Sequence, residues 1–325
     1  MIKIQGLLNS TPLRFTALAA VAVAVLQACG GGGNLTSATA IDAGSTKPWE
    51  LITAGDIAEC NPLRLASDSY AYKTGQLVKR LLSAAGSNSN VLTLGDNAYF
   101  LGQTIGYTAC YAKTWGDFVD KTFTIPGNHD YENNGENNYF DYFGPKASPG
   151  PSFGPDRTGY YRLDQNGWTV FALNSNIDAT AASPQGQWLK AQLATAKPCV
   201  AAAWHHSMFS SVARRGNLKM TELYDMLDKA NADIVLQSHE HQYERFAPLT
   251  AAGTVVAGAG IRSFVVGTGG ANVYGFSGAV TGSEKQIETY GVMQLTLSEG
   301  KGAWRYFDIY DSVLDQGAFD CKKKS

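Results

Sequence analysis

Two histidines, His239 and His241, have the spacing of a metal-binding pair. They follow residues 232–236, a short apolar run with β-branched members that predicts a buried strand. Side chains at positions i and i+2 of an extended segment point the same way, so both imidazoles can face one cleft. Imidazole nitrogen is a common ligand of transition-metal ions. The pair alone is equally compatible with two ordinary surface histidines.

Polar side chains also follow several other predicted strands. The five histidines of the chain all come after apolar runs that are typical of strands: His129, His205, His206, His239 and His241. Two further apolar runs lead into Asp56 and into Asp96, with Tyr99 shortly beyond. Strand ends that deliver Asp, Asn, His or Tyr in this way predict an α/β protein whose site lies at the carboxyl edge of a sheet.

Helices and further strands must position these side chains. Apolar residues at helical spacing predict helices over residues 75–85, 184–196 and 219–230. Asn166-Gly167, which lies between two apolar runs, predicts a β-hairpin within residues 159–173. Alternating apolar residues predict late strands at residues 263–266, 290–297 and 303–309. We expect these late strands to form a second sheet packed on the first, with the helices outside.

The composition argues against a nucleic-acid-binding surface. The chain of 325 residues has a formal net charge of −2, and its basic tail, residues 322–324, is more simply a solvated end. The glycine-rich residues 267–270 lack the helix and the lysine of a phosphate-binding loop, which favours a turn between strands. No repeat or second linker marks another boundary, so residues 47–325 are expected to form one folded domain.

The N-terminal segment predicts export. Residues 15–26 are apolar and uncharged, too few to span a bilayer as a helix but typical of a signal peptide. Leu26-Gln27-Ala28-Cys29 resembles a bacterial lipobox, which predicts a signal peptide over residues 1–28 and a lipid anchor on Cys29. Ordinary cleavage or a free Cys29 are the alternatives. Residues 29–46 suit a flexible tether, so we expect an exported protein of the periplasm or cell envelope, held to the membrane by lipid.

The other four cysteines fit an oxidising compartment. Three pairings are open to Cys60, Cys110, Cys199 and Cys321. We favour Cys60 with Cys110, since both closely follow adjacent site loops, and therefore Cys199 with Cys321. Simple buried thiols are the alternative.

The polar strand ends resemble the motifs of the calcineurin-like metallophosphoesterases, and within them the purple acid phosphatase-like branch. The matching residues occur in the family's order: Asp56, Asp96, Tyr99, Asn128, His129, His205, His239 and His241. The resemblance implies a four-layer α/β/β/α sandwich of two mixed sheets flanked by helices, with residues 47–325 as the catalytic domain.

Some positions depart from the family's pattern. Ala58 stands where most members carry a histidine, and Tyr99 is in the place of the tyrosine that compensates in this branch. Ser238 replaces a usual glycine, Asp130 a glutamate of the plant members, and Ser207 a usual proline. None of these changes removes an expected ligand, although Ser238 could alter the geometry of its loop.

The resemblance also implies two metal ions. Asp56, Tyr99 and His241 would hold the first ion, and Asn128, His205 and His239 the second, with Asp96 bridging. Two such ions can bind the oxygens of an in-line displacement at phosphorus and make hydroxide available near neutral pH. The Tyr99 phenolate favours iron(III) in the first position, and zinc, manganese or iron(II) would occupy the second.

Two histidines remain beyond the expected ligands. His129 would protonate the leaving group or bind the phosphate, with Asp130 orienting its ring. The alternative is that His129 is a ligand or a simple loop residue. His206 has no assigned role in the family; it contacts the substrate phosphate or satisfies a backbone group. Residues 132–153 and 207–217 are expected to shape specificity.

We therefore expect a phosphoric ester hydrolase that is similar to acid phosphatases. It would hydrolyse phosphomonoesters of small molecules by attack of a metal-bound hydroxide, outside the cytoplasm. One alternative is a phosphodiesterase or nucleotidase on the same metal centre. Another is a non-catalytic surface-binding protein that retains the fold.

Overall fold

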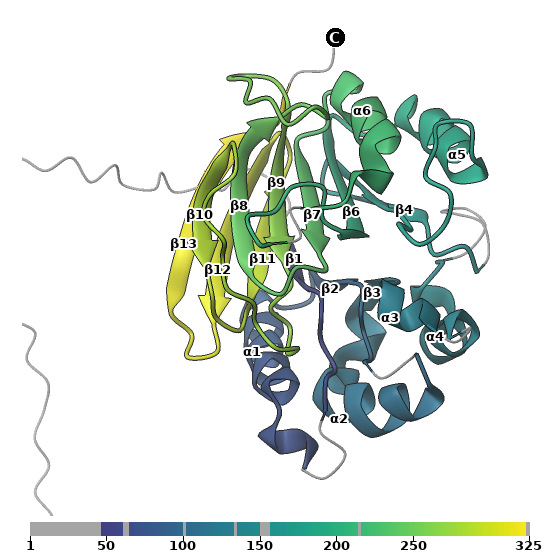
Figure 1. The fold of residues 1–325 in the computed structure, drawn as a ribbon, viewed down its shortest axis with the longest axis vertical. Coiled ribbons are helices and arrows are strands. Elements are labelled where there is room, and N and C mark those ends of the chain that lie inside the picture. The colour runs from purple at the N-terminus through teal and green to yellow at the C-terminus, as the bar shows by residue number, and fades with distance from the viewer. Residues whose placement is uncertain are drawn as a thin grey trace, which may run out of the picture. The chain divides into compact units, whose positions relative to one another are not determined.

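Two mixed β-sheets pack against each other in the computed structural model (Figure 1). The structure describes residues 47–60, 65–99, 102–132, 135–149, 157–213 and 216–322. The predicted signal peptide, tether and Cys29 lie outside the described residues. Among the helices of the described part, none combines the length and the apolar character needed to cross a membrane.

The first sheet has six strands and contains three of the five predicted site strands. In spatial order these are β13 (Val313–Asp320), β12 (Lys301–Asp308), β11 (Gly291–Ser298), β1 (Trp49–Ala54), β2 (Ser89–Leu94) and β3 (Thr122–Ile125). Strands β1, β2 and β3 run parallel, while β11 pairs antiparallel with β1 and begins an antiparallel extension. The carboxyl ends of the three parallel strands therefore meet at one edge.

The second sheet has seven strands and carries the remaining site histidines. In spatial order these are β10 (Ser283–Ile287), β8 (Tyr243–Leu249), β9 (Ile261–Val266), β7 (Ile234–Ser238), β6 (Cys199–His206), β5 (Trp168–Ala172) and β4 (Tyr161–Gln165). Strands β5, β6, β7 and β9 are parallel, and antiparallel strands flank them on both sides.

The predicted grouping of the late strands is wrong. Strand β9 belongs to the seven-stranded sheet beside β7, whereas β11 and β12 extend the six-stranded sheet beside β1. The alternation of apolar residues correctly predicts that each segment is a strand. It carries no information on which edge a strand joins, because pairing depends on contacts between distant segments.

The central strands are mostly apolar because both of their faces are buried. Val170 of β5 and Leu236 of β7 point into the core that the two sheets share. Their neighbours Phe171 and Val235 point the other way, into a second cluster under α5 and α6. Each parallel strand of this sheet therefore separates two hydrophobic layers.

Helices form the outer layers of the predicted four-layer α/β/β/α sandwich, which the structure confirms. The helices are α1 (Tyr70–Ala85), α2 (Ala112–Thr114), α3 (Asn128–Tyr131), α4 (Glu136–Phe143), α5 (Pro184–Leu193) and α6 (Thr221–Lys229). Helix α1 packs on β1, β2 and β11, and α5 and α6 cover the outer face of the seven-stranded sheet (Figure 1).

The three predicted helices are present with shifted ends. Helix α1 begins at Tyr70 rather than at residue 75, because the Ser69 hydroxyl accepts the N–H of Tyr72 and caps the helix there. Ser183 caps α5 in the same way, with Pro184 in the first turn. The hairpin prediction is also confirmed, since Asn166 and Gly167, at φ +48° and +77°, join β4 to β5.

Two disulfides confirm the favoured pairing of the cysteines. Cys60 is bonded to Cys110, close to the loop that follows β1. Cys199 begins β6 in one sheet, and Cys321 follows β13 in the other. The second disulfide therefore joins the two sheets.

Candidate metal centre

Two glycine-aspartate turns build the centre of the site. Asp56 follows β1 and Asp96 follows β2, and both have a left-handed backbone, at φ +57° and +49°. Few residue types other than glycine adopt this conformation readily, and aspartate is one of them. The turns are hydrogen bonded to each other: Asp56 N–H donates to the Gly95 carbonyl at 3.0 Å, and Ile57 N–H to the Asp96 carbonyl at 2.9 Å. The two carboxylates are thus fixed side by side.

Each carboxylate uses one oxygen to hold a neighbouring loop. Asp56 Oδ2 accepts the backbone N–H of His239, and Asp96 Oδ1 accepts that of His129, both at 2.8 Å. The second contact needs the close approach of Gly127, where a Cβ atom would lie 2.1 Å from Asp96 Oδ1. The other oxygens, Asp56 Oδ1 and Asp96 Oδ2, face the remaining donor atoms of the site. Because Asp96 Oδ1 already accepts a backbone N–H, Asp96 Oδ2 is the candidate for a bridging ligand.

Asp56, Tyr99 and His241 bring three donor atoms together. Tyr99 Oη lies 2.9 Å from Asp56 Oδ1 and 2.9 Å from His241 Nε2, and the last two atoms are 3.2 Å apart. Metal–ligand bonds of about 2.1 Å in octahedral geometry separate adjacent donors by about 3.0 Å. The three atoms therefore have the spacing of one face of an octahedron.

His205 is the middle of the second donor set. Its Nε2 lies 3.3 Å from Asp96 Oδ2, 3.1 Å from His239 Nδ1 and 3.1 Å from Asn128 Oδ1. Ligand atoms of Asp96, His205 and His239 all lie within 4.8 Å of one another. The chemistry of this set, one carboxylate, two imidazoles and an amide oxygen, suits a divalent transition metal.

Backbone carbonyls fix the orientation of two of these imidazoles. Nδ1 of His205 lies 2.9 Å from the Leu94 carbonyl and 3.0 Å from the Ser238 hydroxyl, so its Nε2 faces the centre. His241 is held likewise by the Asn272 carbonyl at 2.8 Å. The Ser238 hydroxyl also donates to the Leu94 carbonyl, so it belongs to the same hydrogen-bond network as His205.

Charges within the site shift several pKa values. Burial acts to lower the pKa of His205, but the neighbouring Asp96 carboxylate outweighs burial and raises this pKa to about 9. Burial acts to raise the pKa of Asp56, yet the charge of His241 holds it well below its usual range. Burial, Asp56 and Asp96 all raise the pKa of Tyr99. The negative charges of Asp56 and Asp96 therefore favour positive charge at this site.

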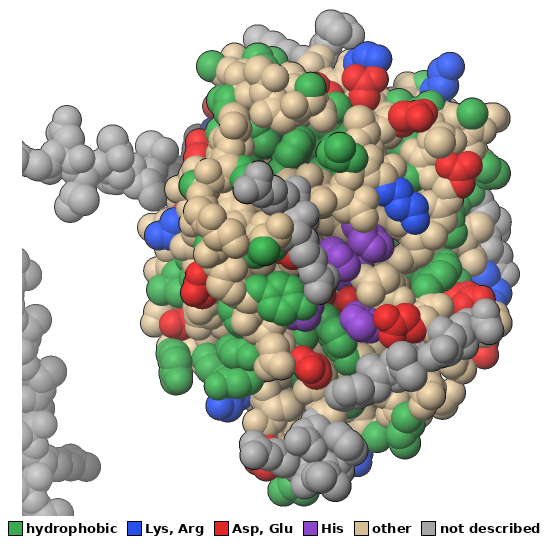
Figure 2. All heavy atoms as spheres, viewed as in Figure 1, with side chains coloured by type: hydrophobic (Ala, Val, Ile, Leu, Met, Phe, Trp, Pro, Cys, Tyr) green, Lys and Arg blue, Asp and Glu red, His purple; other side chains and the backbone are tan. Residues whose placement is uncertain are grey.

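A pocket of about 490 Å³ opens beside the first donor set. Its lining residues are Glu59, Tyr99, His129, Glu132, His241, Asn272 and Tyr274. Figure 2 shows histidine and acidic side chains together in this hollowed face. Tyr274 stacks on the His241 ring, with ring centroids 4.1 Å apart. Ligands held by the donor sets would therefore extend into this pocket.

The sequence model of the calcineurin-like phosphoesterase family matches residues 52–243, a stretch that contains all seven donor residues. The chain belongs to this family. This membership supports a phosphoric ester hydrolase.

Curated relatives assign the chain to the purple acid phosphatase-like branch of the family. Purple acid phosphatase 15 of Arabidopsis thaliana is 25% identical over 233 residues, which are 62% of this chain and 41% of that protein. Purple acid phosphatase 13 of the same plant is 30% identical over 149 residues, 40% of this chain and 27% of that protein. The chain therefore spans less than half the length of these relatives.

Solved structures share the fold. Purple acid phosphatase PPD1 from yellow lupin (Lupinus luteus) seeds superposes with a TM-score of 0.63 at 17% identity, covering 85% of this chain and 54% of that one. GAP50 of Plasmodium gives a TM-score of 0.64 at 14% identity, covering 86% of this chain and 91% of that one.

His129, next to the family's asparagine ligand, faces both the metal centre and the pocket. Its Nε2 lies 3.9 Å from Asp96 Oδ2, and its ring lies against Tyr99, with centroids 4.6 Å apart. The other nitrogen, Nδ1, lies 3.0 Å from Glu132 Oε2. Glu132 thus occupies the position that the sequence suggested for Asp130.

The prediction that Asp130 orients the His129 ring is wrong. The buried carboxylate of Asp130 accepts hydrogen bonds from Gly127 N–H, from the backbone and side chain of Asn97, and from the Tyr107 hydroxyl. Burial and the charge of Asp96 raise the pKa of Asp130 to about 6. Asp130 therefore holds the Asp96 and Asn128 loops together by hydrogen bonds to Asn97 and Gly127.

The His206 ring contacts a side-chain hydroxyl rather than the backbone group that was one of the two expected alternatives. Its Nδ1 lies 2.7 Å from the Ser175 hydroxyl, which also accepts the His206 backbone N–H at 3.2 Å. Burial and the neighbouring charge of His205 lower the pKa of His206 to about 2, so its ring is neutral.

Sequence reasoning missed the pocket residues Glu59, Asn272 and Tyr274. Asn272 and Tyr274 follow the glycine-rich residues 267–270, which form a supporting loop rather than a tight turn between strands. Gly269 N–H donates to the Gly55 carbonyl and Ala271 N–H to the Asp56 carbonyl, each at 2.9 Å. This loop reaches the site only through contacts between distant segments, which no local sequence signal reveals.

Proposed function

We propose that the chain is a binuclear metallophosphatase that hydrolyses phosphomonoesters. One observation carries the proposal: seven donor side chains from five strand ends lie with neighbouring donor atoms 2.9 to 3.3 Å apart. Such close spacing of side chains from five loops in two sheets argues against the alternative that these are ordinary surface histidines. The family and the purple acid phosphatase relatives support the same reaction.

The donor atoms fit two ions. Asp56, Tyr99 and His241 would hold the first, and Asn128, His205 and His239 the second, with Asp96 Oδ2 between them. When bound, the ions would supply Lewis acidity at the phosphoryl oxygens and make hydroxide available near neutral pH. The phenolate of Tyr99 favours iron(III) in the first set, and the imidazoles favour zinc, manganese or iron(II) in the second.

The chain's own residues provide the proton and the orientation of the substrate. His129 Nε2 faces the centre, where it can protonate the oxygen of the leaving alcohol. Glu132 on Nδ1 fixes the plane of the ring. His206 lies beside the second donor set, where its ring contacts the Ser175 hydroxyl.

Two rivals remain to be separated from this function. A phosphodiesterase or nucleotidase would use the same centre on a different ester. A binding protein would keep the fold without catalysis, and GAP50, whose structure is described as an anchor in the inner membrane complex, shares the fold at 14% identity. The complete donor set favours catalysis.

The test combines metal analysis with an assay on residues 47–325. We expect two metal ions per chain, and hydrolysis of an aryl monophosphate that is faster than that of the corresponding diester. Faster turnover of the diester would favour the phosphodiesterase. A bound metal pair without turnover of any ester would favour the binding protein.

We also propose that the protein is exported and anchored by lipid on Cys29. The lipobox-like residues 26–29 and the two disulfides, which are typical of oxidising compartments, support this location. In the full chain, Cys29→Ser should release the protein from the membrane fraction. An unchanged membrane fraction would contradict the anchor.

A further inference from the structure

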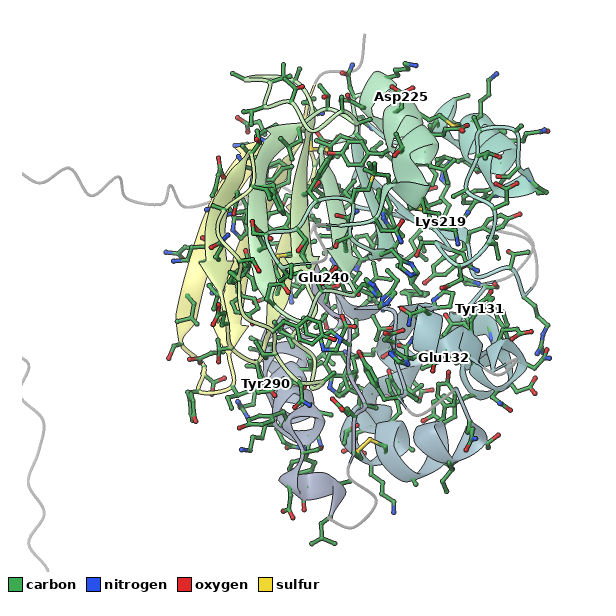
Figure 3. All side chains as sticks on the ribbon, in the orientation of Figure 1. Tyr131, Glu132, Lys219, Asp225, Glu240 and Tyr290 are labelled. Carbon is green, nitrogen blue, oxygen red and sulfur yellow. A yellow bond between two sulfur atoms is a disulfide. The ribbon has the colours of Figure 1, made fainter. Side chains whose placement is uncertain are left out.

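The two flanks of the metal centre differ in charge. The pocket beside the first donor set carries the carboxylates of Glu59 and Glu132, and its described lining residues include no lysine or arginine. Elsewhere on this face, Lys219 carries an exposed positive charge. Figure 3 shows Lys219 and Glu132 on opposite sides of the histidine cluster. A bound ester would therefore have a preferred direction.

Both glutamates keep an oxygen available to a ligand. Glu59 Oε2 accepts the Asn272 N–H at 3.0 Å, and Glu132 Oε2 lies 3.0 Å from His129 Nδ1. In the described part of the chain, the hydrogen bonds of both carboxylates use Oε2, which leaves Oε1 of each for the pocket. The side chain of Glu132 is 35% exposed.

Aromatic rings complete the pocket. Tyr274 stacks on His241 at an interplanar angle of 11°, and Tyr99 lies against His129. Carboxylates combined with aromatic faces attract ammonium groups, because the ring face and the carboxylate are both negative. The same surroundings repel a second phosphate or a carboxylate on the ligand.

We propose that this pocket receives the alcohol part of the substrate and selects small amino alcohols. This inference rests on the proposed function. The substrates would be phosphomonoesters whose alcohol carries an ammonium group, with the phosphoryl group at the donor sets and the ammonium between Glu59 and Glu132. A volume of about 490 Å³ is in the range of small-molecule sites.

The reaction balances without any further reactant. Water adds its hydroxyl to phosphorus, the bond between phosphorus and the alcohol oxygen breaks, and that oxygen takes a proton from His129. The proton that the water releases restores the one lost by His129. The products are inorganic phosphate and the free amino alcohol. Glu59 and Glu132 stay unchanged, and they act on the ammonium group through their charge.

Three esters of similar size test the charge preference. Choline phosphate carries a cation, 3,3-dimethylbutyl phosphate is its neutral isostere, and 3-carboxypropyl phosphate carries an anion. For the metal-loaded protein, we expect kcat/KM for choline phosphate to exceed that of the neutral ester by roughly 5- to 30-fold. The anionic ester should be the slowest. Equal kcat/KM for the cationic and neutral esters would overturn the inference.

Glu59→Gln gives a matched variant. Glutamine keeps an acceptor for the Asn272 N–H and removes the charge, so the ratio between the cationic and neutral esters should fall toward one. Glu222→Gln is the control, because Glu222 also accepts a backbone N–H, from Ala181, but lies outside the pocket lining. An unchanged ratio in Glu59→Gln would assign the preference to other residues and overturn the role of Glu59.

Binding measured without catalysis separates this inference from the proposed function. Saturation-transfer NMR of choline with metal-free protein should show binding that 3,3-dimethylbutanol does not match and that Glu59→Gln weakens. If no ester is hydrolysed but choline binds in this way, the proposed function fails and the pocket assignment stands. If an aryl phosphate is hydrolysed but choline shows no advantage in binding or turnover, the pocket assignment fails alone.

Discussion

At the scale of single residues, the proposed function divides the side chains of the site between holding cations and moving a proton. His129 belongs to the second group: its Nε2 faces Asp96 from 3.9 Å, and its Nδ1 is occupied by Glu132. This arrangement separates the proton donor from the seven donor side chains, so one function can be removed without the other.

His129→Ala should keep both metal ions and lose turnover by roughly 10²- to 10⁴-fold, the usual cost of losing a general acid. The loss should be greatest for esters with poor leaving groups, which need the proton most. Metal analysis and kcat for an alkyl and an aryl phosphate are the measurements. Full activity of the variant would remove His129 from the reaction.

Tyr99→Phe should abolish any visible charge-transfer band and weaken the first ion. The phenol has a raised pKa in the buried site, so its ionisation depends on a cation beside it. Tyr274→Phe is the control: its hydroxyl also lies near His241 Nε2, at 3.4 Å, but outside the donor triangle. A band that survives Tyr99→Phe, or that is lost in Tyr274→Phe, would contradict the assignment to Tyr99.

The donor residues of the site could be predicted from the sequence, but the residue that orients the His129 ring could not. Motif order names the donors, and the structure brings them together. Asp130 was assigned to His129 because the two are adjacent in sequence. In a helical turn, adjacent residues diverge and positions i and i+3 share a face, which is how Glu132 of the α3 end reaches His129.

At the scale of elements, the site depends on turns that only glycine can begin. Gly95, at φ +92°, leads from β2 into Asp96, and a Cβ atom there would lie 2.6 Å from His205 Nδ1. The turn therefore places the backbone of one sheet against a candidate metal ligand, His205, of the other.

Gly95→Ala should lower both thermal stability and the content of the second ion, because the added methyl group pushes His205 away. Gly300→Ala is the matched control: Gly300 has φ +73°, but open space surrounds its missing Cβ. The control should lose only the backbone contribution, about 1–2 kcal/mol, and keep both ions. Equal loss of stability with full metal content in both variants would contradict this effect on His205.

Local sequence patterns predicted the helices and strands better than they predicted which strands pair in a sheet. The hairpin at Asn166-Gly167 and the helix starting at Pro184 depend on neighbouring residues alone, and both were predicted. The division of β9 and β11 between two sheets depends on pairing with β7 and β1, far away in the chain. For the same reason the pocket residues Asn272 and Tyr274 could not be predicted.

At the scale of the whole molecule, the two sheets are joined at both ends of their strands. The donor sets span the carboxyl ends, and the Cys199–Cys321 disulfide lies where β6 begins, with His205 near the other end of that strand. We therefore expect the disulfide to affect stability from one end of the strands and the donor sets to affect metal binding from the other end.

Replacing Cys199 and Cys321 with serine should lower the free energy of unfolding by roughly 2–5 kcal/mol, given a loop of this length, and leave metal content unchanged. Replacing Cys60 and Cys110 should instead weaken metal binding, because that disulfide lies beside the Asp56 loop. Urea titration and metal analysis of both double variants are the measurements. Loss of ions from the Cys199 and Cys321 variant would show that the two ends are coupled.

The carboxylates of Asp56 and Asp96 are each anchored by a backbone amide from an adjacent loop. Their positions are consequently set by the polypeptide before any ion arrives. We therefore expect the chain to fold without metal ions and to bind them afterwards. Dialysis should then exchange the bound ions without unfolding the protein. The metals bound in a purified sample would then depend on which metals were available to the protein, as well as on which metals the ligands prefer.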